Sequence, residues 1–229
     1  MKVEVIGGGK ERLGARAAVW VADRLWTAVA ERGVAHLAVS GGSTPGPMFT
    51  ALARLPVPWA RVEVWQVDER VAPDGEPARN ATLLLADLLG PVRLPSGQVH
   101  LMGVTADDLD AAAAEYAAAL ERACGGVLDV VHLGIGPDGH TASWVPGDPV
   151  VDVTDRLVAS SGEYQGRRRM TLTVPAVNAG RALMLQVVGA DKAAAVAGML
   201  QGDPTLPASR LRADTVVIAD AGAASATAG

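Results

Sequence analysis

The chain has 229 residues, of which 49% are hydrophobic, so it can bury one sizeable core while staying within the size of a single domain. Its 25 acidic residues outnumber its 20 lysines and arginines, which gives a formal net charge of −5. That balance, with no basic stretch, argues against a nucleic-acid-binding protein. An anionic ligand must then be held by a few clustered cations and by backbone N–H groups.

The cysteine content and the first residues bear on the cellular compartment. Cys124 is the single cysteine, which excludes an intramolecular disulfide and fits a reducing compartment. The first residues contain only a four-residue apolar run, which is too short for a signal peptide or a membrane span. We therefore expect a cytoplasmic protein that does not contact a membrane.

Apolar runs typical of strands alternate with segments of helical periodicity along the chain. The first helix is indicated by apolar residues at every fourth position, and Gly33 ends it. Strands are expected at residues 3–6, 36–40, 62–68, 99–102, 128–136, 170–174, 182–189 and 215–219, and further helices at 41–55, 79–89, 106–122 and 192–200. This alternation predicts an α/β fold with a doubly wound, mostly parallel sheet and helices on both faces, a Rossmann-like single domain.

Three further expectations concern position within this fold. Residues 128–136 form a continuous apolar run, which predicts a strand near the sheet centre that is covered on both faces. Residues 146–169 lack a clear period and are expected to form an extended loop beside the site. The domain is expected to cover residues 1–220, and the small residues of 221–229 predict a disordered tail.

In a doubly wound sheet, ligands bind outside the carboxyl ends of the strands, so polar motifs directly after strands are the candidates for a site. The first motif is SGGSTP, in which two glycines permit a tight turn and free N–H groups and hydroxyls suit a phosphate. Its phosphate-binding candidates are Ser40, Gly41, Gly42, Ser43 and Thr44. On this motif alone, an ordinary strand-to-helix turn is an equal alternative.

The second motif, Asp68-Glu69-Arg70, follows the strand at 62–68. Arg70 is suited to grip a phosphate through two hydrogen bonds, while Asp68 is suited to accept hydrogen bonds from sugar hydroxyls. A solvated acidic turn is the alternative for this motif.

The third motif is GIGPDGHTAS, which places Asp138 and His140 on a glycine-rich loop after the central strand. His140 is the catalytic candidate because it combines this loop with an adjacent carboxylate, whereas His132 lies inside the strand and is expected to be a satisfied buried group. Arg169, before the strand at 170–174, and Lys192, an isolated lysine after the strand at 182–189, supply further cations.

These motifs together resemble the 6-phosphogluconolactonase family. The strings SGGSTP, DER with Asn80 downstream, GIGPDGHTAS, RRRMTLTVPAVNAGRA and VVGADKAAA occur in that family's order and spacing over residues 37–199. The resemblance implies hydrolysis of 6-phosphoglucono-1,5-lactone, the second step of the oxidative pentose phosphate pathway, with no metal and no organic cofactor. The expected partner is this sugar-phosphate lactone alone, bound by a monomer.

The resemblance also implies roles for individual residues. His140 is the general base that activates water, Asp138 lies beside it, and Asp68 belongs to the same catalytic group. The implied phosphate-binding and sugar-binding positions are Ser43, Thr44, Arg70, Asn80, Arg169 and Lys192.

Three other functions compete with this interpretation. The related glucosamine-6-phosphate deaminases carry a catalytic Glu five residues after the His, where this chain has Val145. A sugar-phosphate sensor of a transcription regulator would need a DNA-binding module, and the residues before His36 hold only one long helix. A dinucleotide-binding oxidoreductase is disfavoured because the string GGGKER lacks the third glycine or alanine of its fingerprint.

Overall fold

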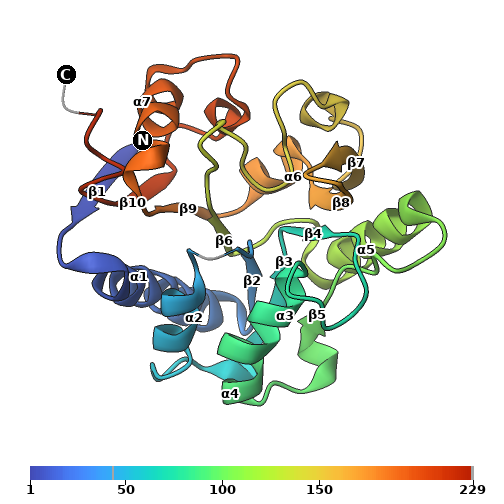
Figure 1. Cartoon of the computed structure of the whole chain (residues 1–229). Coiled ribbons are helices and arrows are strands. Elements are labelled where there is room, and N and C mark those ends of the chain that lie inside the picture. The colour runs from blue at the N-terminus through green and yellow to red at the C-terminus, as the bar shows by residue number, and fades with distance from the viewer. Residues whose placement is uncertain (43, 228–229) are drawn as a thin grey trace.

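A seven-stranded parallel sheet forms the centre of the protein in the computed structural model, which describes residues 1–42 and 44–227 (Figure 1). Its strands lie in the order β1-β10-β9-β6-β2-β3-β5, which places β6 in the middle as predicted. Their bounds are Lys2–Ile6 (β1), Ala35–Val39 (β2), Val62–Gln66 (β3), Val99–His100 (β5), Val130–Leu133 (β6), Ala182–Val187 (β9) and Val216–Asp220 (β10). Every neighbouring pair in this sheet is parallel.

The helices follow the predicted alternation with the strands. They are Gly9–Arg32 (α1), Gly46–Leu52 (α2), Asn80–Leu84 (α3), Gly90–Val92 (α4), Leu109–Cys124 (α5), Val174–Ala179 (α6) and Ala193–Gln201 (α7). The helix predicted at 79–89 consists of α3 and a π-helical segment, Leu85–Leu89. No helix in the part of the chain that the structure describes is long and apolar enough to cross a membrane.

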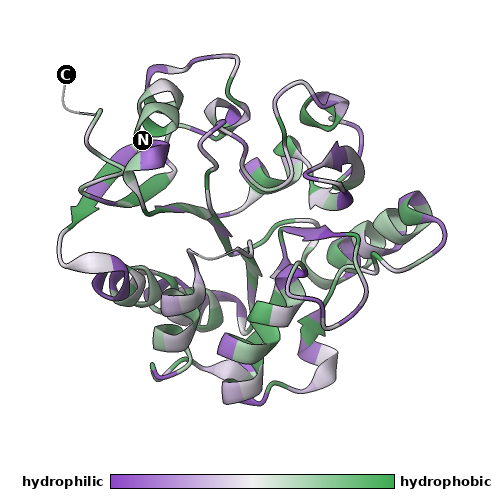
Figure 2. Cartoon of the chain, viewed as in Figure 1, coloured by the Kyte–Doolittle hydropathy of each residue, from purple (hydrophilic) through white to green (hydrophobic). Residues whose placement is uncertain are grey.

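Helices cover both faces of the sheet because its strands are apolar on both sides. Leu37 and Val39 point into a core shared with α1 and α2, whereas Ala38 points into a second core shared with α5, α6 and α7. In the view of Figure 1, α1 and α2 lie below the sheet and α6 and α7 lie above it. Apolar residues, green in Figure 2, run along the central strands between these layers. The predicted α/β, doubly wound fold is confirmed.

The direction of winding reverses between β2 and β6. From β2 the chain continues outward through β3 to β5, and from β6 it continues outward on the other side through β9 to β10. A crevice therefore opens between the segments that follow β2 and β6, at the carboxyl ends of the strands.

A second sheet was not predicted. Asp68–Arg70 (β4), Val158–Tyr164 (β7) and Arg167–Leu172 (β8) form three antiparallel strands in the order β4-β8-β7. The prediction of an extended loop over 146–169 is wrong for the residues of β7 and β8, and the strand predicted at 170–174 belongs to this sheet. β7 is hard to recognise because serines and a glycine interrupt its alternation, so its pairing with β8 defines it.

The segment after β10, predicted to be a disordered tail over residues 221–229, is described as far as residue 227. Residues 221–227 form turns in which Ala223 and Ala224 are buried. The Asp220 carboxylate accepts a hydrogen bond from the Ala223 amide at 2.7 Å, which fixes the first turn. The Gly189 amide makes a bifurcated hydrogen bond to both oxygens of this carboxylate, at 3.1 and 3.2 Å. Small side chains allow this segment to approach the loop after β9, as Gly222 shows by lying against the backbone of Ala190.

Candidate active site

Segments that follow β2, β3, β6 and β9 line one pocket of about 270 Å³ at the carboxyl edge of the sheet, together with the β7–β8 hairpin. The pocket brings together most of the residues that the sequence nominated: Ser40, Gly41, Gly42, Thr44, Asp68, Arg70, Asn80, His140, Arg169 and Lys192. Asp138 does not line the pocket itself but is hydrogen-bonded to His140, which does. Ser43 lies outside the described residues.

His140 is held by its neighbour on the glycine-rich loop. Its Nδ1 lies 2.5 Å from Oδ1 of Asp138, and its backbone N–H donates to the same oxygen at 3.2 Å. Burial alone would raise the pKa of Asp138, but the bonds and charge of His140 and the hydroxyl of Tyr164 hold it below its usual value. The ionised carboxylate therefore fixes the imidazole tautomer with the proton on Nδ1, which leaves the lone pair of Nε2 for the pocket.

Glycines in two motifs are required by close approach. A Cβ on Gly136 would collide with the His140 ring and lie 2.7 Å from Oδ1 of Asp138. A Cβ on Gly41 would likewise collide with the side chain of Asn80. The glycines thus let the loops after β6 and β2 approach the side chains of the site.

Asp68 lines the pocket and is buried. Its Oδ2 accepts a hydrogen bond from the Ser143 hydroxyl at 2.8 Å. Burial raises the pKa of Asp68 against the opposite effects of that bond and of the charges on Arg70 and Arg169. The alternative of a solvated acidic turn is therefore wrong.

Three cations face the same pocket. Arg70 and Arg169 lie directly opposite each other on β4 and β8, an arrangement that is unfavourable unless an anion or a carboxylate shares the space. Burial lowers the pKa of Arg169, while Asp68 opposes that change. Lys192 lies near the start of α7, where its Nζ is 2.8 Å from a carboxylate oxygen of Asp191.

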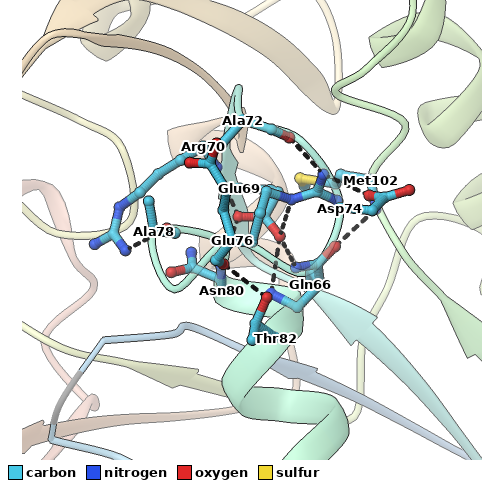
Figure 3. Close-up of polar contacts among 12 residues, drawn as sticks. Gln66, Glu69, Arg70, Ala72, Asp74, Glu76, Ala78, Asn80, Thr82 and Met102 are labelled. Carbon is cyan, nitrogen blue, oxygen red and sulfur yellow. Dashed lines mark hydrogen bonds and ion pairs between the residues drawn. The ribbon is translucent and has the colours of Figure 1, made fainter.

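Glu69, for which the sequence predicted no role of its own, is the centre of a buried hydrogen-bond cluster, and Figure 3 shows its contacts. It is fully buried and accepts hydrogen bonds from the side chain of Gln66 and from the backbone N–H groups of Arg70, Asn80 and Ala81, at 2.7 to 2.9 Å. The buried guanidinium of Arg79 pairs with it at 3.1 Å. This cluster fixes two pocket residues, because Arg70 follows Glu69 directly and the Asn80 side chain donates to the Asp68 carbonyl at 2.9 Å.

His132 and Gln186 form another part of the pocket that the sequence did not reveal. Both are buried, with His132 Nε2 and Gln186 Oε1 3.0 Å apart, and the Gln186 amide donates to the Thr44 carbonyl at 3.3 Å. Within the described chain, the pocket-lining residues also include four with a buried polar side-chain atom that has no hydrogen-bond partner: Ser40 Oγ, Asn80 Oδ1, His132 Nδ1 and Arg169 Nε. The expectation of a fully satisfied His132 is therefore wrong, and the pocket is suited to a strongly polar ligand.

No group of three or more His, Cys, Asp or Glu side chains in residues 1–42 and 44–227 is arranged to hold a metal ion. The ionisable groups that line the pocket include the His140 imidazole, the Asp68 carboxylate and the cations of Arg70, Arg169 and Lys192.

Comparisons with known proteins identify the family of the chain. A 6-phosphogluconolactonase of Mesorhizobium japonicum is 41% identical over 197 residues, covering 82% of this chain and 80% of that protein. A 6-phosphogluconolactonase of Streptomyces coelicolor is 36% identical over an alignment of 244 residues, gaps included, which covers 96% of this chain and 93% of that protein. The crystal structure of a 6-phosphogluconolactonase from Thermotoga maritima, at 25% identity, superposes with a TM-score of 0.86 over 96% of this chain and 98% of that one.

A family model described as glucosamine-6-phosphate isomerases/6-phosphogluconolactonase matches residues 9–219. The model thus spans all four strand ends that line the pocket. The chain belongs to the glucosamine-6-phosphate isomerase/6-phosphogluconolactonase family and, within it, to the 6-phosphogluconolactonase subfamily.

Proposed function

We propose that the chain hydrolyses 6-phosphoglucono-1,5-lactone to 6-phosphogluconate by means of a water molecule activated by His140. The observation that carries this proposal is the placement of an imidazole, oriented by Asp138, in one pocket with Arg70, Arg169 and Lys192. A base and an anion-binding set are what a phosphorylated ester requires. We assign the reaction to the second step of the oxidative pentose phosphate pathway and, because a chain with one cysteine has no internal disulfide, to the reducing cytoplasm.

The proposed reaction begins when His140 Nε2 takes a proton from water as the water oxygen attacks the lactone carbonyl carbon. Asp138, bonded to Nδ1, stabilises the imidazolium that forms. The carbonyl oxygen becomes an oxyanion, and the guanidinium groups of Arg70 and Arg169 are the cations of the pocket suited to stabilise it. The bond from the carbonyl carbon to the ring oxygen then breaks, and the ring oxygen takes the proton from His140, which restores the neutral imidazole.

The phosphate of the substrate would bind where donors converge on the turn after β2. Thr44 and the glycine turn line the pocket on this side, and Lys192 reaches it from the loop after β9. Ser43, placed by the family motif in the same turn, is proposed as a further phosphate ligand. Binding energy from the phosphate would orient the reacting ester at the distant end of the molecule.

Deamination of glucosamine 6-phosphate is the competing reaction within this family. The position where the deaminases carry a catalytic Glu is Val145, whose side chain has no proton to transfer. We therefore propose that this chain does not release ammonia from that substrate.

The test is lactone hydrolysis by the wild type and by His140→Ala, corrected for spontaneous opening and run beside an ammonia-release assay. We expect His140→Ala to lower kcat by about 10²-fold or more, since a general base contributes about 10² to 10⁴. His100→Ala is the matched control, because His100 lies on β5 outside the pocket, stacked on Trp65. A folded His140→Ala that keeps more than about a third of kcat would remove the general base from the proposal.

A further inference from the structure

Tyr164 is held at the tip of the β7–β8 hairpin, which closes one side of the pocket. It pairs with Arg167 across a two-residue turn made by Gln165 and Gly166, whose φ angles are 53° and 75°. Two successive residues with positive φ are typical of the tight turns that join antiparallel strands without splaying them. The turn therefore fixes the direction in which Tyr164 leaves β7.

The Tyr164 side chain contacts both members of the catalytic pair. Its hydroxyl donates to Oδ2 of Asp138 at 2.9 Å, while Oδ1 of the same carboxylate is taken up by His140. Its ring lies edge-on to the imidazole, with 5.3 Å between ring centroids. The guanidinium carbon of Arg169 lies over the same ring, 4.9 Å from its centroid, so Tyr164 contacts both His140 and Arg169.

We propose that Tyr164 is a positioning residue, whose hydroxyl holds the Asp138 carboxylate in the orientation that presents His140 to the substrate; this inference rests on the proposed hydrolase function. With one partner on each oxygen, the carboxylate cannot rotate without losing a charge-assisted hydrogen bond. Without the hydroxyl, Oδ2 has no partner among the described residues, and the carboxylate is free to turn away from Nδ1. Tyr164 thus acts through Asp138 and His140 and does not itself react.

The charges around Tyr164 keep its hydroxyl a donor. Burial, followed by the bond and charge of Asp138, raises the pKa of the Tyr164 phenol, whereas Arg169 and the neighbouring Gln165 act in the opposite direction. The phenol therefore stays protonated at and above neutral pH, and it can donate to the ionised Asp138 throughout the working range of the enzyme.

The kinetic test is Tyr164→Phe, which removes the hydroxyl and keeps the ring that contacts His140 and Arg169. We expect kcat to fall about tenfold with little change in KM, as for the loss of one hydrogen bond to a charged group. Because the freed Asp138 carboxylate turns away from Nδ1 and no longer favours the protonated imidazole, the acid limb of the kcat profile should move to lower pH. A variant with wild-type kcat and an unmoved acid limb would overturn the proposal.

The matched control is Tyr116→Phe, because Tyr116 is the only other tyrosine and its hydroxyl bonds Gln66 in the core, away from the pocket. This variant should lose stability without moving the acid limb, which separates a general loss of packing from loss of positioning. Circular dichroism of each variant establishes that it is folded.

A second measurement does not depend on activity. In the Tyr116→Phe protein, Tyr164 is the one remaining tyrosine, so the phenolate absorbance reports its titration alone. We expect a midpoint above that of a free tyrosine, and a lower midpoint when Asp138→Asn is added. An unchanged midpoint would overturn the proposal even if the wild type opened the lactone. If the wild type failed to open the lactone, the proposed function would fail, and this titration would still decide whether Tyr164 holds Asp138.

Discussion

His132 is a buried histidine on β6 whose environment opposes a positive charge. Burial lowers its pKa to about 4, against the smaller opposite effect of its hydrogen bond to Gln186. In the unfolded chain the pKa of the same imidazole is about 6.5. Between these two pH values the unfolded state binds more protons than the folded state, so acid favours unfolding there.

We therefore expect the free energy of unfolding to fall as the pH drops from about 6.5 towards 4, by on the order of 3 kcal/mol from this residue. Below the folded-state pKa this contribution to the slope should disappear. The measurement is urea unfolding over a pH series, with His132→Gln expected to flatten the slope and His100→Gln as the control. The same slope in wild type and His132→Gln would contradict the assignment.

At the scale of residues, the sequence could predict a site residue where its side chain belongs to a short motif. His140 and Asp138 are two residues apart on one short loop, so their proximity follows from the chain itself. His132 and Tyr164 could not be placed in this way. Whether a residue of a buried strand or a hairpin faces the pocket depends on strand register and hairpin direction, which arise from pairing with distant segments.

At the scale of elements, Glu69 joins β4 to the start of α3. Its carboxylate accepts hydrogen bonds from the backbone N–H groups of Asn80 and Ala81 in the first turn of that helix. It also forms an ion pair with Arg79, which directly precedes the helix. All of these groups are buried, so each hydrogen bond would be costly to leave unmade. The small sheet and the helix are thereby fixed relative to each other, with Arg70 and Asn80 between them.

We predict that Glu69→Gln lowers the free energy of unfolding by about 3 kcal/mol, because it leaves the buried Arg79 guanidinium with only the exposed carboxylate of Asp74 as a counter-charge and turns one acceptor into a donor. Urea denaturation measures this loss. Glu76→Gln is the control, since Glu76 pairs with Arg167 at the surface, where an ion pair contributes about 1 kcal/mol or less. Equal effects of the two substitutions would show that the Glu69 cluster does not anchor the helix.

The elements of the parallel sheet were predictable and those of the small sheet were not. β2 and β6 are fully buried, so each shows as an apolar run without reference to its neighbours. β4 has two acidic residues and an arginine, and it becomes a strand only by pairing with β8, which lies far along the chain. Local sequence does not encode such a pairing, and a polar strand therefore resembles a turn.

At the scale of the whole molecule, the pocket differs in charge from the protein as a whole. The formal net charge is −5, yet Arg70, Arg169 and Lys192 line the same pocket. A substrate anion is thus repelled by the average surface and bound by a local field of the opposite sign. Such an arrangement favours a ligand whose charge is concentrated in one group.

We predict that the phosphate is required, so that kcat/KM for unphosphorylated glucono-1,5-lactone is at least about 10²-fold lower. Lys192→Ala should raise KM for the phosphorylated lactone about tenfold or more with kcat largely kept, because it removes a charge that binds substrate and transition state alike. Steady-state kinetics measure both effects, with Lys10→Ala on the exposed side of α1 as the control. Comparable kcat/KM for the two lactones would exclude a phosphate site in this pocket.

The pairing of β1 with β10 has a consequence for how the molecule is assembled. β1 is hydrogen-bonded to no strand other than β10 in the described sheet, and β10 lies at the opposite end of the chain. During synthesis β1 therefore leaves the ribosome well before β10, and it has no partner strand until β10 has emerged. Closing so long a loop is entropically costly and slow, so this edge should be the last part of the sheet to form and the first to open. The loop that carries His140 follows β6, the central strand of the same sheet, so partial opening at the β1 edge would leave this loop in place.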